Sequence, residues 1–271
     1  MNLFHAIVLG LVQGLTEFLP VSSSGHLRIV PAFLGWDDPG TAFTAVIQLG
    51  TMAAVLLYFA ADIKRVLGAW LAGLFNASKR DNLDYRMGWM IVLGTVPISL
   101  IGLVFRHQIS SGGRNLYIIG TMLIVFGVVL ALADRFGSQR REVEQMTVRD
   151  GFLIGVAQTL ALIPGVSRSG STISAGLAFG LTRAAAARYS FLLSIPAVVL
   201  SGLFELKDIG GADSPGLMPT LVATVVAFVV GYASIAFLLR YLERHTVYVF
   251  SAYRIVLGAV VLALVASNTI S

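Results

Sequence analysis

Apolar residues run through most of this 271-residue chain in stretches long enough to cross a membrane. A spanning helix needs roughly 20 mostly apolar residues, and six stretches reach or nearly reach that length. They lie at about residues 43–60, 87–105, 116–133, 189–206, 218–239 and 247–267. The pattern predicts an all-α polytopic membrane protein that forms a single integral membrane domain over residues 1–271.

Two further apolar regions, at about residues 3–35 and 151–182, are interrupted by clusters of Pro, Gly and Ser. Each of them predicts two short helices around a non-helical turn. Non-helical backbone at membrane depth is tolerated only where protein buries it or where it lines a watery cavity. We therefore expect two re-entrant broken helix pairs, each of which enters and leaves on one side of the membrane.

The two broken regions resemble each other after a shift of 145 positions without gaps. Both halves of the chain also show the same order, a broken pair followed by three spans. We interpret this as an internal duplication, with repeat 1 at about 1–145 and repeat 2 at about 146–271. Because each repeat crosses the membrane an odd number of times, the repeats are expected to have inverted topology. The identical pairs are Gly10–Gly155, Gln13–Gln158, Leu15–Leu160, Val21–Val166, Ser22–Ser167, Ser24–Ser169 and Gly25–Gly170.

Composition and charge agree with a membrane location. The chain is 56% hydrophobic and 12% charged, with a mean hydropathy of +0.84, whereas soluble domains carry about 25% charged residues. Thirteen of the 19 basic residues fall in connections on one side of the six-span arrangement, including an expected loop at 61–86. The positive-inside rule makes that side cytoplasmic and both termini external. The connections on the opposite side carry Arg106, Arg114 and Lys207.

The first broken region contains polar groups that a membrane span would exclude. Ionisable groups at membrane depth are costly and are functional candidates by default. Gln13 and Glu17 lie four residues apart, on one face of a helix that Pro20 ends or kinks. Glu17 can be satisfied structurally by a neighbour, can orient an imidazole, or can bind a divalent metal ion together with Gln13.

Three consecutive serines, Ser22, Ser23 and Ser24, follow at the expected start of the next short helix. One serine is enough to cap a helix. His26 lies three residues after Ser23, which is close enough for an activated nucleophile, and histidine suits proton transfer near neutral pH. The pattern therefore indicates catalysis in addition to capping.

The second broken region, Pro164–Thr172, carries groups that suit an anion. Gly165 permits close approach of the backbone, and the serines Ser167 and Ser169 offer hydroxyls at a helix start. Arg168 supplies a fork that matches phosphate oxygens, and Thr172, four residues later, can point at the same site. The structural alternative is a capped turn whose arginine pairs with Glu17. In the last span, Arg254 is either a second phosphate contact or part of a structural ion pair.

At these residues the sequence resembles the undecaprenyl pyrophosphate phosphatase family, also called the bacitracin resistance protein family. One motif is the (E/Q)-x-x-x-E segment that leads into P-V-S-S-S/T-G-H, here Gln13 to His26. The other is P-G-x-S-R-S-x-x-T, here Pro164 to Thr172. Length, segment order and the stretch Phe43–Gly50 extend the similarity over nearly the whole chain.

The resemblance implies a bacterial inner-membrane hydrolase that converts undecaprenyl diphosphate to the monophosphate carrier lipid and phosphate. This reaction recycles the carrier for peptidoglycan synthesis and confers bacitracin resistance. It implies a divalent cation, Mg²⁺ or Ca²⁺, and as partners the polyprenyl lipid and the bilayer, with no nucleic acid. The residues implied are Gln13 and Glu17 for metal or proton handling, Ser23 and His26 at the reacting centre, and Ser167, Arg168 and Thr172 on the diphosphate.

Ser23, His26 and water all stay open as the attacking nucleophile. A second function class also stays open, because inverted repeats with broken helices at the midplane are a transporter design. The alternative is a secondary transporter or lipid flippase for an anionic substrate, since fold does not fix function. Nothing in the sequence indicates the oligomeric state.

Overall fold

The computed structural model describes residues 1–105, 114–205 and 216–270, so Arg106 and Lys207 lie outside the described residues. The described part is helical, with eleven α-helices and three short 3-10 helices. The α-helices are α1 (Leu3–Phe18), α2 (Ser23–Leu34), α3 (Gly40–Tyr58), α4 (Ala60–Phe75), α5 (Leu83–Val104), α7 (Leu116–Phe136), α8 (Val148–Gln158), α9 (Arg168–Ala178), α10 (Arg183–Glu205), α11 (Leu217–Leu242) and α12 (Tyr248–Ala266). The 3-10 helices are η1 (Ala77–Lys79), η2 (Val143–Gln145) and η3 (Thr159–Leu162).

Five of the described helices are long and apolar enough to cross a membrane by themselves, namely α5, α7, α10, α11 and α12. Helix α3 passes the same test only together with α4, and the two helices meet at a bend of 71°. All six stretches expected to span therefore form helices, and the number of candidate spans is five or six. This agrees with a polytopic membrane protein.

The prediction of a loop over residues 61–86 is wrong, because α4 occupies most of the segment. Lys64 and Arg65 made the stretch too polar to qualify as a span. The other face of α4 is apolar and packs against α5, where the Trp70 side chain lies against the backbone of Gly88. Tertiary packing of this face therefore stabilises a helix in a segment whose charged residues had favoured a loop.

Both broken regions contain two helices around an irregular turn, as expected. Helix α1 ends at Phe18 because Leu19 is extended, the conformation favoured before a proline, and because Pro20 has no N–H. Helix α2 begins at Ser23. In the second region α8 runs into η3, and α9 begins at Arg168 after five irregular residues.

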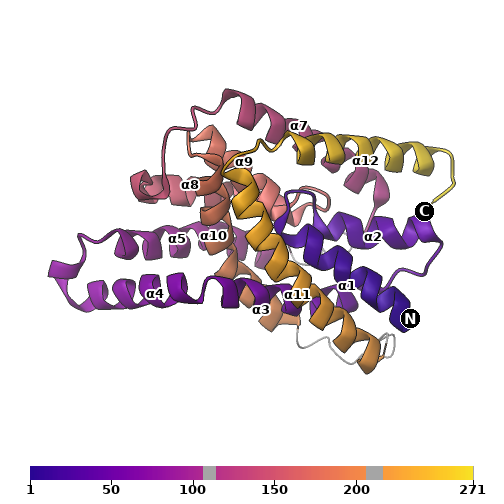
Figure 1. The fold of residues 1–271 in the computed structure, drawn as a ribbon, viewed down its shortest axis with the longest axis horizontal. Helices are drawn as coiled ribbons and strands as arrows, with labels where there is room; N and C mark the ends of the chain where they lie inside the picture. Colours follow the sequence, from indigo (N-terminus) through magenta and orange to yellow (C-terminus); the bar gives the residue numbers. More distant parts are fainter. Residues whose placement is uncertain (106–113, 206–215, 271) are drawn as a thin grey trace.

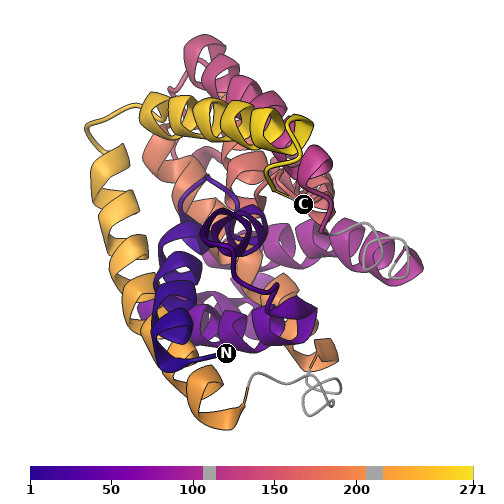
Figure 2. The ribbon, with the colours of Figure 1, turned by 90° about the vertical axis from the view of Figure 1, so that its right-hand side faces the viewer.

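Helices from the two halves of the chain pack against each other. Helix α1 of the first half packs against α11 of the second, and α8 of the second half packs against α5 of the first (Figure 1). Helices α7 and α12, the last of each half, lie side by side along one edge of the molecule. Both chain termini lie at the end of the molecule that faces the viewer in Figure 2.

Glycines allow these crossings to be close. A Cβ on Gly155 of α8 would overlap the backbone of Gly94 on α5, and a Cβ on Gly50 of α3 would overlap the carbonyl of Thr224 on α11. Because lipid tails are as apolar as the side chains, helix association in a membrane depends on close van der Waals packing between small residues. These glycines therefore set the distance between helices of different halves.

Replacing Gly155 with alanine is expected to destabilise the protein by about 1–3 kcal/mol, the usual cost of overpacking. The new methyl group must push α8 away from Gly94, since backbone atoms cannot move aside as a side chain can. Thermal unfolding in detergent, followed by size-exclusion chromatography, measures the loss. Gly68→Ala in α4 is the matched control, because nothing beyond the neighbouring backbone of its own helix lies within 4 Å of its Cβ position. Equal melting temperatures for the two variants would contradict the packing argument.

Candidate active site

Two serines at equivalent repeat positions cap the second helix of each broken pair. Ser22 caps α2 with φ 77°, and Ser167 caps α9 with φ 74°. The Ser22 hydroxyl accepts from the Gly25 N–H at 3.3 Å, and the Ser167 hydroxyl accepts from the Gly170 N–H at 3.1 Å. A left-handed conformation is strained for serine by roughly 1–3 kcal/mol and concentrates at functional sites. The same unusual cap therefore occurs twice, 145 residues apart.

The serine hydroxyls two residues further on also occupy equivalent positions in the two turns. Ser22 Oγ lies 3.3 Å from Ser24 Oγ, and Ser167 Oγ lies 3.1 Å from Ser169 Oγ. Ser169 donates its proton to the carbonyl of Leu19 at 3.1 Å, so Ser167 is the donor within its own pair. Ser169 thereby ties the second turn to the first, whereas Ser24 is exposed.

The first turns of α2 and α9 retain free backbone donors. The N–H groups of Ser23, Ser24, Arg168 and Ser169 make no hydrogen bond to the rest of the described chain. Such orphan N–H groups, together with the positive end of the helix dipole, favour an anion. Two helix starts of this kind, joined by Ser169, offer a site for a charged group inside an apolar protein.

Glu17 is the centre of the polar cluster. Its Oε1 accepts from Arg168 NH2 at 2.6 Å, and its Oε2 accepts from Ser23 Oγ at 2.6 Å and from Gln13 Nε2 at 3.1 Å. The side chains of the ion pair are 8% exposed for Glu17 and 16% exposed for Arg168. The two broken regions therefore meet at one carboxylate, and Gln13, Glu17, Ser23 and Arg168 come together as expected.

Arg168 keeps donors available. Besides its bond to Glu17, its NH1 reaches the carbonyl of Ser194 on α10 only at 3.5 Å. A guanidinium has five N–H donors in a fixed fork. The ion pair with Glu17 therefore uses part of the fork, and the rest can meet a phosphate.

Thr51 is a member of the cluster that the sequence did not single out. Its hydroxyl accepts from Gln13 Nε2 at 3.2 Å and donates to the Gln48 carbonyl at 2.9 Å. Thr51 lies on α3, directly after the stretch Phe43–Gly50 that carries part of the family resemblance. The resemblance over that stretch was the one sequence feature that pointed to this part of α3. Thr51 fixes the amide of Gln13 so that it donates toward Glu17.

His26 lies apart from the Ser23–Glu17 pair. Its Nδ1 is 2.8 Å from the carbonyl oxygen of Ser22, and its Nε2 is 2.7 Å from the hydroxyl of Tyr253 on α12. Neither ring nitrogen contacts Ser23 or Glu17 in the described structure. The pairing of Ser23 with His26 suggested by their spacing is not present, and Glu17 takes that place beside Ser23. Tyr253 is a second residue that the sequence did not indicate.

Thr172 faces α10. Its hydroxyl lies 2.6 Å from the hydroxyl of Ser190 and donates to the Arg168 carbonyl at 2.8 Å. The residue is buried. Thr172 therefore braces α9 against α10, while the guanidinium of Arg168 reaches toward Glu17.

Arg254 is fully buried and joins the two turns. Its guanidinium donates to the carbonyls of Pro20 in the first turn and of Gly165 and Val166 in the second, at 2.8–3.0 Å. Longer contacts of 3.4 and 3.5 Å reach carbonyls of α7. No carboxylate of the described residues lies within ion-pair distance of it. Its donors are thus occupied by backbone.

The polar cluster offers few ligands for a metal ion. The described residues contain no group of three or more His, Asp or Glu side chains that can hold one. Glu17 is the single carboxylate of the cluster, and Gln13 faces it with its amide nitrogen. Mg²⁺ is commonly held by one or two carboxylates together with substrate phosphates. The cluster fits a cation shared with a phosphate ligand and does not fit a cage made by protein alone.

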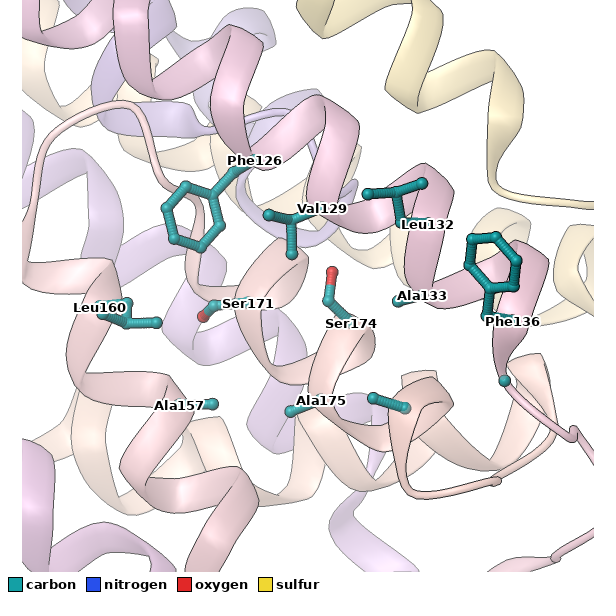
Figure 3. A pocket seen from close by; sticks show the side chains of 12 residues that line it. Phe126, Val129, Leu132, Ala133, Phe136, Ala157, Leu160, Ser171, Ser174 and Ala175 are labelled. Atoms are coloured by element: carbon teal, nitrogen blue, oxygen red, sulfur yellow. The ribbon is translucent and has the colours of Figure 1, made fainter.

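A separate cavity of about 490 Å³ lies between α7, α8 and α9, and Figure 3 shows the side chains that line it. Its walls are apolar, with Phe126, Val129 and Phe136 on α7. Two hydroxyls reach it, those of Ser171 and Ser174, but each donates to a backbone carbonyl of its own helix. The cavity therefore offers apolar surface without reactive groups, and the chemistry belongs to the Glu17 cluster.

Residues 6–260 of the chain match the protein family described as Bacitracin resistance protein BacA. The chain belongs to this family. A relative from Mycobacterium ulcerans named undecaprenyl-diphosphatase is 56% identical over 275 residues, which cover 100% of this chain and 99% of that protein. Proteins of the same name from Nocardioides sp. and Thermobifida fusca are 55% and 51% identical, covering 99% and 93% of their own lengths.

Membership of this family accounts for the two motifs that converge in the structure. The motif from Gln13 to His26 supplies the carboxylate and the start of α2, and the motif from Pro164 to Thr172 supplies Arg168 and the start of α9. Their convergence brings together residues about 150 positions apart in sequence.

Replacing Arg254 with leucine is expected to unfold or strongly destabilise the protein. The change leaves the carbonyls of Pro20, Gly165 and Val166 without a partner, and each buried unsatisfied group costs about 1–3 kcal/mol. The melting temperature in detergent measures the effect. Arg135→Leu at the exposed end of α7 is the control, since its side chain has no hydrogen bond in the described structure. A wild-type melting temperature for Arg254→Leu would show that the hydrogen bonds from Arg254 to the two turns are not needed for stability.

Proposed function

We propose that this protein hydrolyses undecaprenyl diphosphate to undecaprenyl phosphate and inorganic phosphate, and so recycles the carrier lipid for cell-wall synthesis. Its relatives are named undecaprenyl-diphosphatase. The observation that carries the proposal is the Ser23–Glu17–Arg168 cluster at two helix starts. It combines a hydroxyl nucleophile, a base and an anion-binding guanidinium within an apolar protein. Bacitracin resistance, which the description of the family names, is assigned to the same reaction.

The two halves are proposed to be inverted repeats, with boundaries at about residue 145. Support comes from the equivalent caps at Ser22 and Ser167 and from the reciprocal packing of α1 on α11 and of α8 on α5. An odd number of crossings in each half requires inversion. On this arrangement the hairpins enter from opposite sides and their turns meet near the bilayer midplane.

The protein is proposed to lie in the bacterial inner membrane with both termini external. The termini share one end of the molecule, while the α4–α5 turn and the α7–α8 connection lie toward the other end (Figure 1). Those two connections carry Lys79, Arg80, Arg140 and Arg141, which face the cytoplasm by the positive-inside rule. The hairpin that contains Glu17 then enters from the external side.

Binding of the diphosphate is assigned to Arg168 and the free N–H groups at the starts of α2 and α9. The fork of Arg168 matches two phosphate oxygens, and Ser22, Ser24, Ser167 and Ser169 hold the helix starts in place. Gly165 lets the second turn lie against α7, because a Cβ there would meet the carbonyl of Ile119 at 2.6 Å. The buried ion pair with Glu17 holds Arg168 in position before substrate arrives.

Ser23 is the nucleophile that the geometry favours. Its hydroxyl already donates to Glu17 Oε2 at 2.6 Å, so the carboxylate can take the proton as Ser23 Oγ bonds to the terminal phosphorus. The bond from that phosphorus to the bridging oxygen breaks, and undecaprenyl phosphate leaves. Water then attacks the phosphoserine, releases phosphate and restores the serine. Arg168 stabilises the charge on the phosphoryl oxygens in both steps.

A divalent cation, Mg²⁺ or Ca²⁺, is proposed to bind together with the diphosphate. Glu17 and Gln13 would supply the protein ligands, Gln13 after its amide turns so that the oxygen replaces the Nε2 that donates to Glu17 and Thr51. The substrate would supply phosphate oxygens. When bound, the ion neutralises charge on the diphosphate. The residues of this chain orient the substrate and move the serine proton.

Replacing Glu17 with glutamine or Ser23 with alanine should lower phosphate release in detergent by about a hundredfold or more, because each change removes a partner of the proton transfer. Glu243→Gln at the exposed end of α11 is the carboxylate control and keeps full activity. Acid-quenched wild-type enzyme should also yield a phosphorylated peptide containing Ser23. Full activity in Ser23→Ala would assign the attack to another group.

The same assay separates hydrolysis from transport. In detergent no gradient exists across a bilayer, so a transporter or flippase releases no phosphate. Phosphate release by purified protein supports the hydrolase, and its complete absence with a folded protein and added Mg²⁺ would favour the transport alternative.

Removal of divalent cations with EDTA is expected to abolish phosphate release, and added Mg²⁺ or Ca²⁺ to restore it. The physical reason is that the cation of the cluster, Arg168, is already paired with Glu17, so the protein alone leaves most of the negative charge of a diphosphate unbalanced. The melting temperature of the protein without substrate should not change on EDTA addition, because the ion arrives with its ligand. Undiminished activity in EDTA would remove the cation from the mechanism.

A further inference from the structure

Tyr253 of α12 covers the outer nitrogen of His26. Its hydroxyl lies 2.7 Å from His26 Nε2, and the two rings stack with centroids 5.6 Å apart and planes inclined by 11°. Tyr253 is 46% exposed and His26 is 5% exposed. The tyrosine thus stands between the imidazole and the surroundings, and its contact crosses from the second half of the chain to the first.

The hydrogen bonds define the protonation of the imidazole. A carbonyl oxygen only accepts, so the contact between Nδ1 and the Ser22 carbonyl at 2.8 Å requires a proton on Nδ1. In the neutral ring Nε2 then has a lone pair, and the Tyr253 hydroxyl donates to it. When Nε2 gains a proton, the same hydroxyl can rotate and accept. Tyr253 therefore serves both forms of His26 without movement of its ring.

The charged neighbour of this pair is Arg254, the next residue of α12, which acts electrostatically on the imidazole. Its guanidinium is fixed by carbonyls of both turns. The helix that positions the tyrosine is therefore the helix that holds the two broken turns together. Ser22, whose carbonyl accepts the hydrogen bond from His26 Nδ1, also caps α2 ahead of Ser23.

We propose that Tyr253 is a positioning residue for the hydrolysis, which acts by holding the Nε2 side of His26 in place while the Ser22 carbonyl fixes the Nδ1-protonated tautomer. This inference rests on the proposed function and on the place at the reacting centre that the family resemblance implies for His26. Tyr253 does not touch the Ser23–Glu17 pair in the described structure. Its effect on turnover passes through the imidazole.

The decisive variant is Tyr253→Phe, which keeps the stacked ring and removes the hydroxyl. Phosphate release from undecaprenyl diphosphate in detergent should show kcat lowered roughly three- to tenfold, the loss of one hydrogen bond, with little change in KM. The limb of the pH–kcat profile that His26→Gln abolishes should move to lower pH. The reason is that the imidazolium loses the oxygen that accepts its Nε2 proton.

Two comparisons separate positioning from packing. Tyr248→Phe is the matched control on the same helix, because Tyr248 is similarly exposed and makes no hydrogen bond or ring contact in the described structure. It should keep the wild-type rate and pH profile. Tyr253→Leu removes ring and hydroxyl together, and should show the same shift of the pH limb as Tyr253→Phe.

The double variant His26→Gln/Tyr253→Phe tests whether the tyrosine acts through the histidine. If the tyrosine acts through the histidine, the double variant is no slower than His26→Gln alone, because the imidazole that the Tyr253 hydroxyl bonds to is already absent. A double variant whose loss of kcat equals the product of the two single losses would overturn the inference. A wild-type pH profile in folded Tyr253→Phe would also overturn it.

These outcomes are distinct from failure of the proposed function. If wild-type protein releases no phosphate, or if His26→Gln is fully active, the role assigned to His26 is wrong, and the role assigned to Tyr253 is wrong as well. If His26→Gln is impaired while Tyr253→Phe matches wild type in rate and pH profile, only the assignment of Tyr253 is wrong. Equal melting temperatures for Tyr253→Phe and Tyr248→Phe establish that both variants are folded.

Discussion

The buried guanidinium of Arg254 is the interaction on which the two broken helix pairs depend. A helix interrupted inside a membrane exposes carbonyls that neither water nor the helix itself can satisfy, and each such group is costly in a lipid environment. Arg254 satisfies carbonyls from both turns at once, those of Pro20, Gly165 and Val166. One side chain therefore makes two unfavourable turns compatible with burial and fixes their relative position.

Once the turns are fixed, the polar cluster follows from their position. The first turn brings Glu17 and Ser23, the second brings Arg168, and the ion pair between them joins the two halves. Buried ion pairs contribute little net stability because desolvation offsets their attraction. A pair of this kind at membrane depth is therefore better explained by the chemistry it supports than by stability.

The repeats have diverged at this cluster. Gln13 donates to Glu17 and Thr51, but its counterpart Gln158 is fully buried and its amide has no hydrogen-bond partner among the described residues. The reason lies four residues later, where the second copy has Leu162 in place of Glu17. The second copy has instead an arginine, Arg168, where the first has Ser23. Two similar hairpins thus supply different parts of one cluster rather than two equivalent clusters.

The sequence by itself determined the helical spans, the two broken pairs and the motif residues, because span length and helix interruption are local properties that hydropathy, proline and glycine report directly. It misplaced α4, since packing against α5 compensates for the charges on that helix. Spacing suggested that Ser23 and His26 pair. The fold instead places Glu17 beside Ser23 and Tyr253 beside His26, because hydrogen-bond partners depend on which helices cross. His26 and Tyr253, 227 positions apart, meet only because α12, which packs against α7, also reaches the start of α2. Contacts of this range were decided by tertiary structure alone.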